Sequence, residues 1–163
     1  GGGSNNSETW NGSNWTEVAD LNTAKEQTAG AGTTTSGLVY GGRTGPTAMN
    51  ATVETWNGSS WTEVNDLNNA ETGTTMFGTS TSAIAAGGYQ PGSPNVLATT
   101  EDWNGTSWQE VADLNTAREL SAASKGGSPS SGFLFGGHAG PAGTTATEEW
   151  SGSTNTTKSI DTD

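Results

Sequence analysis

The side chains that could carry out chemistry are few and widely spaced. The 163-residue chain has one histidine, His138, two tyrosines, Tyr40 and Tyr89, and no cysteine. A Ser-His-Asp triad needs a histidine between a nucleophile and a carboxylate, and no such set is spaced around this one. Without cysteine, neither a disulfide framework nor a thiolate metal site can form. No glycine-rich loop leads into a helix, as a phosphate-binding loop does. These residues therefore predict a protein that is not an enzyme and has no cofactor.

One acidic position recurs and could serve in cation binding. Asp20, Asp66 and Asp113 each lie within the same short motif, Glu-Val-Ala/Asn-Asp-Leu-Asn. Carboxylates that recur in this way could line a calcium site together with backbone carbonyls. An aspartate at the end of a strand also caps the following turn through its own backbone. We favour this capping role, so no metal site is predicted, and the three aspartates are the alternative ligands.

The charge of the chain excludes two classes of partner. The formal net charge is −12, from 17 acidic and five basic residues. Nucleic-acid binders need a basic stripe that displaces counterions from phosphate. Anionic membrane surfaces likewise attract basic segments. No apolar run approaches the length of a membrane span. We therefore expect no nucleic-acid partner and no membrane insertion, and an acidic surface that favours solubility.

An internal repeat predicts the elements that position these side chains. The segment from Trp10 to Val18 recurs from Trp56 and from Trp103, and a shortened copy begins at Glu149-Trp150. The first tryptophans are 46, 47 and 47 residues apart. Between them, an apolar run ends each time in paired glycine. These pairs are Gly41-Gly42, Gly87-Gly88 and Gly136-Gly137.

Each repeat predicts four short strands, which are clearest in the middle copy. Residues 72–79 form a strand of small side chains, residues 82–88 are a buried run, residues 99–103 alternate, and residues 108–111 follow a tight turn. That turn contains Asn104-Gly105, a strong hairpin signal, because both residues accept the positive φ of a type I′ turn. No segment sustains helical periodicity, so the fold class is all-β.

Glycines and tryptophans have structural roles in this scheme. Glycine after an apolar strand indicates positive φ or the close approach of another backbone. A small sheet must bury both faces against its neighbours, and an indole buries about 150–250 Å². Stacking of a sugar on one indole is the alternative role. The tryptophans expected to pack between sheets are Trp10, Trp15, Trp56, Trp61, Trp103, Trp108 and Trp150.

The pattern resembles the kelch repeat, in which a strand ends in Gly-Gly and is followed by a glutamate-aromatic pair and a tryptophan. Gly41-Gly42, Glu54-Thr55-Trp56 and Trp61 fit this pattern. The basic position that opens the next strand holds Lys25 and Arg118, but Glu71 in the middle copy departs from it. Some kelch-like propellers have a copper oxidase site of histidines, tyrosines and a cysteine-linked tyrosine, for which this chain lacks the residues.

The resemblance implies a β-propeller of four-stranded antiparallel blades, of which the chain covers about three and a half. We expect residues 1–23 to supply the last two strands of one blade, followed by blades at 24–69, 70–116 and 117–163. The last strand is expected at 154–161, where Asn155 replaces the second tryptophan. These counts suggest a chain that starts within a blade and ends at a natural terminus. Propellers typically have 4–8 blades, so further blades or further copies of the chain would complete the ring.

At finer detail, the segment Glu54–Val64 and its Ser/Thr/Gly/Asn-rich surroundings resemble kelch-like repeats in virion proteins of marine bacteriophages, which are tail or appendage components facing the host. This resemblance implies a recognition or structural module that binds a host-surface receptor or glycan, or another virion protein. The alternative is an extracellular glycan- or protein-binding propeller of cellular origin. Its sequons would then be glycosylation points, although three coincide with predicted turns. They lie at Asn5, Asn11, Asn14, Asn50, Asn57, Asn104 and Asn155.

The loops between the second and third strands are the candidate binding sites. They are expected at 43–52, 89–99 and 138–147, are the longest connections, and differ most among the copies. The Asn-Gly turns at the opposite end barely vary. Loops tolerate change while a sheet does not, so recognition is expected in the variable loops, with drift as the alternative. The candidate binding residues are Arg43, Met49, Tyr89, Gln90, Pro91 and His138.

Overall fold

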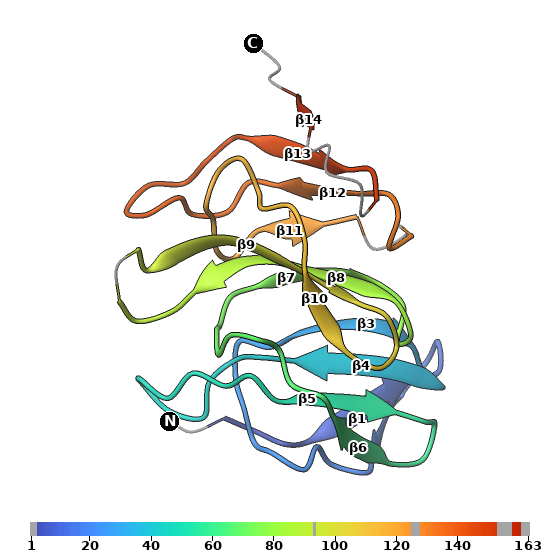
Figure 1. Cartoon of the computed structure of the whole chain (residues 1–163). Helices are drawn as coiled ribbons and strands as arrows, with labels where there is room; N and C mark the ends of the chain where they lie inside the picture. The colour runs from blue at the N-terminus through green and yellow to red at the C-terminus, as the bar shows by residue number, and fades with distance from the viewer. Residues whose placement is uncertain (1–2, 93, 125–127, 153–157, 161–163) are drawn as a thin grey trace.

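The described part of the chain is built from antiparallel sheets. The computed structural model describes residues 3–92, 94–124, 128–152 and 158–160, the last three by their backbone. Within these ranges there are strands and no helix, arranged as three four-stranded sheets and one two-stranded sheet (Figure 1). The predicted all-β fold of propeller blades is therefore confirmed. The sheets do not close into a ring.

The strands of each sheet pair in the order of the sequence. β1 (Ser7–Trp10) and β2 (Trp15–Val18) form the two-stranded sheet. The first four-stranded sheet consists of β3 (Ala29–Thr33), β4 (Ser36–Tyr40), β5 (Val53–Trp56) and β6 (Trp61–Val64). The middle sheet consists of β7 (Thr75–Gly78), β8 (Ala83–Tyr89), β9 (Val96–Trp103) and β10 (Trp108–Glu110). The last sheet consists of β11 (Ala122–Ala123), β12 (Gly132–Phe135), β13 (Thr147–Trp150) and β14 (Lys158–Ile160).

The first strands of the three larger sheets approach one another. β3 contacts β7, and β7 contacts β11. The sequence Ala-Gly-Ala-Gly-Thr in β3 and the two alanines of β11 are small, so neighbouring backbones can come close without collision. The first strand of each sheet therefore lies at the inner edge of the arrangement, and the fourth strand lies at the outer edge.

Two hydrophobic cores lie on the two faces of the middle sheet. Along β8, Ala83 and Ala85 belong to the core shared with the first sheet, while Ile84 and Ala86 belong to the core shared with the last sheet. Successive side chains of a strand point to opposite faces, and here both faces are buried. This explains why the strand is an almost continuous run of apolar residues. Each core is thus made by two consecutive sheets.

The first tryptophan of each four-stranded sheet is buried, and its indole N–H has a hydrogen-bond partner at an equivalent position of its own sheet. Trp56, Trp103 and Trp150 are 6%, 1% and 4% exposed. Each indole N–H donates to a carbonyl in the turn between the first two strands of its own sheet. These carbonyls belong to Thr34, Ser80 and Pro129, at 3.0, 3.1 and 2.9 Å. The indole therefore fastens the inner hairpin to the third strand while filling the space between sheets.

The second tryptophan of a repeat faces the preceding sheet. The ring centroid of Trp108 lies 5.6 Å from that of Tyr40 in β4, and Trp108 is buried. Trp61 is half-buried and donates its indole N–H to Ser7 Oγ in β1 at 3.1 Å. Trp15 is 63% exposed and Trp10 is 45% exposed, because no described sheet covers their side of β1 and β2. Their role in packing between blades stays a prediction.

The paired glycines have the expected positive φ, and Gly87 and Gly88 also lie close to the backbone of the next sheet. All six have positive φ: Gly41 62°, Gly42 88°, Gly87 66°, Gly88 133°, Gly136 65° and Gly137 93°. Gly88 N–H also donates to the carbonyl of Arg118 at 2.8 Å, at the entry to the next sheet. A Cβ on Gly87 would lie 2.3 Å from that same carbonyl oxygen. Glycine is therefore required here both for its conformation and for the contact between sheets.

The predicted type I′ turns are wrong. Asn57 and Asn104 do not have positive φ, whereas Gly58 and Gly105 do, at 94° and 92°. Trp56 pairs with Trp61 and Trp103 with Trp108, so each loop has four residues rather than two. The side-chain Oδ1 of Asn104 accepts the N–H groups of Thr106 and Ser107 at 2.9 and 3.0 Å. Asparagine therefore serves here as a side-chain cap of the turn, and its own backbone needs no unusual φ.

Candidate functional site

The three variable loops begin at equivalent positions of successive sheets. The residue after each glycine pair forms an antiparallel bridge with a residue in the segment that enters the sheet. These pairs are Arg43 with Glu26, Tyr89 with Thr72, and His138 with Glu119. As a result, the loops lie along one edge of the sheets, at the left in Figure 1, and the Asn-Gly turns lie along the other edge. We call the edge formed by the described residues of 43–50, 89–95 and 138–144 the loop face.

The predicted binding residues differ in how far they are available on this loop face. Arg43 is about one-third exposed, and its Nε lies 2.8 Å from Glu26 Oε1. Met49, which bridges back to Arg43, is half-buried, as are Tyr89 and Gln90. Pro91 and His138 are exposed. The structure therefore brings the six residues to one edge in three separate loops, where they can offer a guanidinium, an imidazole and a phenol to a partner.

The second of these loops is shorter than predicted. Strand β8 continues through the glycine pair to Tyr89, and β9 begins at Val96, so the connection is 90–95 rather than 89–99. The backbone groups of Tyr89 and Thr72 exchange hydrogen bonds of 2.7 and 3.0 Å, which extend the sheet past the glycines. A register shift between Ala86 and Gly88 marks a bulge at this point. The sequence alone placed the end of the strand at the glycines, where the chain in fact only bends.

Beside the loop face, the inner edge has a left-handed backbone position in each sheet. Gln27, Gly73 and Leu120 occupy the same place in the three repeats and have φ of 57°, 65° and 53°. Leu120 N–H donates to the carbonyl of Gly73 at 2.7 Å, which links the last sheet to the middle one. The Leu120 side chain is 53% exposed. Sequence reasoning did not find this position, although Gly73 is one of its three members.

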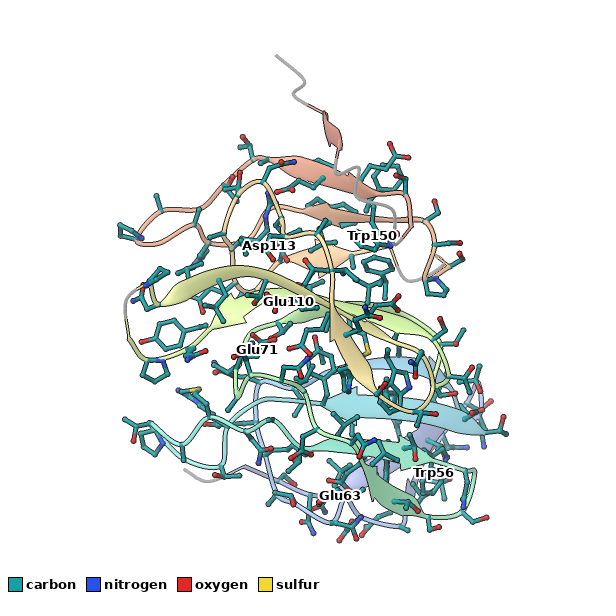
Figure 2. All side chains as sticks on the ribbon, viewed as in Figure 1. Trp56, Glu63, Glu71, Glu110, Asp113 and Trp150 are labelled. Carbon is teal, nitrogen blue, oxygen red and sulfur yellow. The ribbon has the colours of Figure 1, made fainter. Side chains whose placement is uncertain are left out.

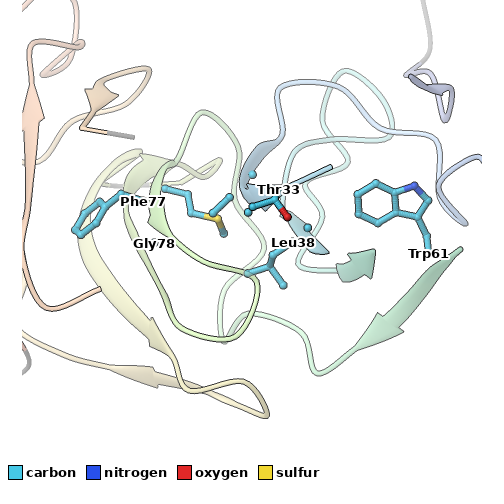
Figure 3. Close-up of a pocket in the computed structure, with 10 residues that line it drawn as sticks. Thr33, Leu38, Trp61, Phe77 and Gly78 are labelled. Carbon is cyan, nitrogen blue, oxygen red and sulfur yellow. The ribbon is translucent and has the colours of Figure 1, made fainter. Parts of the chain in front are cut away.

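A pocket of about 350 Å³ lies at the opposite edge, near the inner hairpins (Figure 3). Figure 3 shows the Trp61 indole on one side, Phe77 on the other, and Leu38 and Thr33 between them. The glycines of β3 and β4 contribute only backbone to the wall, so the pocket is wide but has few side-chain polar groups. Its lining consists of residues 30–33, Gly37, Leu38, Trp61 and residues 76–78. The sequence did not predict it, and the signal would have been the small residues of β3.

A buried ion pair recurs in the first and last sheets. Lys25 Nζ lies 3.3 Å from Glu54 Oε1, and both side chains are fully buried. Arg118 pairs with Glu148 Oε1 in the same way and also donates to the carbonyls of Gly136 and Ala146. In both sheets, the other carboxylate oxygen, Oε2, accepts a backbone N–H from the preceding connection, at Asn22 and Asn115. The carboxylate therefore ties the incoming chain to the third strand of the sheet.

The middle sheet has two carboxylates at these positions. Glu101 Oε2 accepts the backbone N–H of Asn68 at 3.1 Å, as its counterparts accept those of Asn22 and Asn115, and it also accepts from the Asn68 side chain at 2.7 Å. The basic residue, however, is replaced by Glu71, which lies inside the molecule between the first and middle sheets (Figure 2). Burial raises the pKa of Glu71 to about 8, and the negative charge of Glu101 adds to this rise. Burial also raises the pKa of Glu101.

The three aspartates considered as metal ligands are all exposed and lie in three different repeats. Asp20 accepts a hydrogen bond of 3.4 Å from Asn5 Nδ2. Among the residues that the structure describes, no group of three or more His, Cys, Asp or Glu side chains is arranged to hold a metal ion. The carboxylates that are buried and accept backbone hydrogen bonds are instead Glu54, Glu101 and Glu148. Their signal in the sequence was a glutamate two residues before each first tryptophan.

Several sequon asparagines use their side chains in hydrogen bonds within turns and loops. The side chains of Asn57 and Asn104 cap turns, and Asn50 Oδ1 accepts from the Thr52 backbone and hydroxyl at 2.6 Å. Asn155 lies outside the described residues. Whether any sequon is glycosylated stays open to experiment.

The fold and the repeated sheets define this chain as one of β-propeller type, and comparison with solved structures agrees. One similar structure is that of YjhT, with a TM-score of 0.75 and 14% sequence identity. The match covers 90% of this chain and 49% of that one, so the chain spans about half the length of YjhT. At this identity the likeness shows the fold alone. No protein-family model matches the sequence, and no curated protein matches it.

In the described residues there is no helix long and apolar enough to cross a membrane.

Proposed function

We propose that this chain is a non-catalytic recognition module whose partner binds the loop face. One observation carries the proposal: three loops of different sequence begin at equivalent positions of successive sheets and lie along one edge. The sheets between them are close copies of one another. A repeated scaffold that presents variable loops side by side is suited to binding an extended surface, because loops accept change while the packed sheets do not.

The placement of the titratable groups supports binding over catalysis. Glu71 and Glu101, whose pKa values are raised, are each 3% exposed, so a substrate does not reach them. His138 is exposed in a loop, and its backbone exchanges hydrogen bonds of 2.9 Å with Glu119. An enzyme would place such groups together in an accessible cleft.

The particular setting that we propose is a kelch-like virion component of a bacteriophage. The Glu54–Val64 pattern and its resemblance to virion proteins of marine phages support a tail or appendage protein. Its partner would be a host-surface receptor or glycan, or another virion protein, and its location the virion or the extracellular space. A cellular, extracellular propeller that binds glycan or protein is the alternative. Glycans found on Asn50 or Asn57 by mass spectrometry of natively produced protein would favour that alternative.

The proposal is tested by removing the loops while keeping the sheets. Residues 43–50, 90–95 and 138–144 are replaced by short Gly/Ser connections, and binding is measured to cell envelopes of marine bacteria and to purified phage virion proteins. We expect the variant to keep its tryptophan fluorescence and unfolding temperature near those of the wild type and to lose binding. A matched control changes the other edge, with Ser59→Ala and Thr106→Ala, and should bind as the wild type does. Undiminished binding by the loop variant would show that the partner uses another surface.

A further inference from the structure

The middle sheet differs from its two neighbours at a position where all three are buried. Glu54, Glu101 and Glu148 are equivalent, and each uses Oε2 to accept a backbone N–H from the preceding connection. In the first and last sheets, Oε1 contacts a cationic side chain. In the middle sheet, the residue equivalent to that cation is Glu71. The comparison within one chain therefore points to the replacement of a buried cation by a second buried carboxylate.

Two carboxylate oxygens at this position have no partner within hydrogen-bonding distance, although the backbone N–H of Asn69 also acts on Glu101 and lowers its pKa. Of the buried side-chain polar atoms in the described residues, only three have none, and two of these are Glu71 Oε2 and Glu101 Oε1. Oε1 of Glu101 corresponds to the oxygen that contacts Lys25 and Arg118 in the other sheets. A buried acceptor without a donor costs free energy, and a buried carboxylate costs more. Such atoms therefore point to a ligand that the side chains alone do not supply.

Glu71 and Glu101 occupy the two positions whose side chains are in contact in the first and last sheets. The negative charge of Glu101 raises the pKa of Glu71, and the charges of both raise the pKa of Tyr40, whose ring lies in the core between the first and middle sheets. The other oxygen of Glu71, Oε1, accepts from Thr74 Oγ1 at 3.1 Å. The unpartnered oxygens therefore belong to one buried polar cluster of Glu71, Glu101, Thr74 and Tyr40.

We propose that Glu71 and Glu101 bind a divalent cation, with Ca²⁺ as the fitting ion, in place of the basic side chain of the other sheets. Charge indicates the valence of a metal ion here: the Lys25–Glu54 and Arg118–Glu148 pairs are neutral overall, and a single metal ion must be doubly charged to neutralise two ionised carboxylates. The donors are all oxygen, which hard cations prefer. Ca²⁺ accepts irregular sets of oxygens, while Mg²⁺ keeps several waters and needs a regular octahedron that a dry core does not favour.

The neighbouring sheets also indicate a third source of oxygen. Lys25 Nζ donates to the backbone carbonyl of Thr52 at 3.3 Å, and Arg118 donates to that of Ala146 at 2.8 Å. Thr99 has the equivalent position in the middle repeat, 47 residues from each. A backbone carbonyl is a common Ca²⁺ ligand and adds no charge to the site. The proposed ion would therefore link the start of the middle sheet to its third strand, as the basic side chains do in the other two sheets.

The test measures Ca²⁺ binding to the full chain after removal of metal with a chelator. Isothermal titration calorimetry and the unfolding temperature are followed with CaCl₂ at constant ionic strength, with MgCl₂ as the comparison salt. We expect one Ca²⁺ per chain and an unfolding temperature that rises to a plateau. Glu71→Lys, which restores the pairing of the first sheet, should bind Ca²⁺ at least about tenfold more weakly, since even outer partners of a metal contribute that much. It should also be more stable than the wild type in chelator.

A surface variant with the same charge change separates this site from the acidic surface. Glu63 is exposed and lies at the surface of the first sheet in Figure 2, so Glu63→Lys should bind Ca²⁺ as the wild type does. If Glu71→Lys does not fold, Glu101→Gln decides in its place, because it removes one charge and keeps an oxygen for Asn68. The proposal is overturned if the wild type binds no Ca²⁺ and its stability responds to pH alone, since the occupant is then a proton. It is also overturned if Glu71→Lys or Glu101→Gln binds as the wild type does.

Discussion

At the scale of single residues, the repeats act as controls for one another. The same position holds Lys25, Glu71 and Arg118, and in each repeat the equivalent glutamate accepts a backbone N–H from the preceding connection. The differences in charge and hydrogen bonding at this position can therefore be assigned to one side chain. The same reasoning applies to Trp108, whose indole N–H is buried without a partner. The indole N–H of Trp61 donates to Ser7 Oγ. For Trp108, the residue equivalent to Ser7 is Val53, whose side chain has no acceptor.

The buried Glu71 predicts that the metal-free protein loses stability as the pH rises. Its pKa is about 8 in the folded state against 4.5 when unfolded, so the folded state holds the extra proton between these values. Stability from this group is complete below pH 4.5, falls through the interval, and is lost above pH 8. In chelator, the unfolding equilibrium constant should rise by up to about tenfold per pH unit. Glu71→Gln should remove most of this slope in urea unfolding, and Glu63→Gln should leave it. An equal slope in Glu71→Gln would assign the effect to other groups.

At Leu120, we expect the glycine variant to be more stable than the alanine variant, which is the reverse of the usual order. Its φ of 53° is in the left-handed region, which disfavours any residue with a Cβ, and its side chain is about half exposed. Leu120→Gly should therefore be more stable than Leu120→Ala by about 1 kcal/mol in chemical unfolding. At Ala123, whose φ is not positive, the order should be the usual one, with the glycine variant less stable than the wild type. Equal stability of the two Leu120 variants would show that the backbone relaxes there.

At the scale of elements, the sheets are held by what lies between them rather than by pairing alone. The two cores fill the faces between consecutive sheets, and backbone hydrogen bonds from Gly42 and Gly88 reach the next sheet. The first tryptophan adds a bond from the third strand to the inner hairpin of the same sheet. A single repeat of this kind cannot bury its hydrophobic faces alone. Its stability therefore depends on both of its neighbours.

Equivalent tryptophans should differ greatly in their contribution to stability. Trp103 is 1% exposed and bonded to Ser80, so Trp103→Ala should lower the free energy of unfolding by about 3–5 kcal/mol. Trp15→Ala removes a side chain that is 63% exposed and should change it by less than about 0.5 kcal/mol. Urea unfolding of the two variants measures the difference directly. A large loss for Trp15→Ala would mean that a surface not described here covers it.

The repeat spacing was sufficient to predict the class of fold and the approximate position of most strands. The apolar runs that mark β4 and β8 accompany burial on both faces, and β12 has the same run although Phe133 and Phe135 are partly exposed. The turns were harder, because Asn57-Gly58 fits a type I′ turn as well as the side-chain cap that occurs. Only the pairing of Trp56 with Trp61 decides between them.

The candidate site was predictable only in outline. Loop variability placed Arg43, Tyr89 and His138 together, and the bridges of the three loops explain why they share an edge. The pocket beside Trp61 depends on the side chains that β3 lacks and on a neighbouring strand from another repeat, so no local pattern contains it. The carboxylate pair was visible as a departure of Glu71 from the repeat. Its burial and its unpartnered oxygens could be found only from the three-dimensional structure.

At the scale of the whole molecule, the two ends of the array of sheets expose apolar side chains, whereas the equivalent side chains between sheets are buried. We call these two surfaces the end faces. Phe133 and Phe135 of β12 are 38% and 41% exposed. They correspond to Leu38 and Tyr40 in β4, which the next sheet buries to 2% and 0%. At the other end, Trp10 and Trp15 are exposed while their counterparts Trp103 and Trp108 are buried. Both end faces therefore have the composition of an interface between sheets, and either further blades or further copies would suit them.

These end faces predict concentration-dependent association of the chain in solution. Unlike surfaces at the two ends permit head-to-tail contact, in which one copy offers β1 and β2 to the β12 side of another. In sedimentation velocity, the wild type should shift to larger species as its concentration rises, and Phe133→Ser with Phe135→Ser should reduce this shift. Leu120→Ser removes an apolar side chain that is more exposed, at 53%, but lies away from the end faces, and it serves as the control. A wild type that stays monomeric at high concentration would contradict the prediction.

The sharing of each core by two consecutive sheets has a consequence for how the molecule comes apart. In the described part of the chain, each hydrophobic core is shared by consecutive sheets, so the free energy of opening is approximately a sum of local terms rather than one global quantity. The middle sheet is covered on both faces, whereas the first and last sheets each have one side with less cover. Amide hydrogens of β8 should therefore exchange most slowly, and those of β12 sooner, as the array frays inward from its ends. A ring closed by further sheets would have no such ends, and its opening would require two interfaces to break at once.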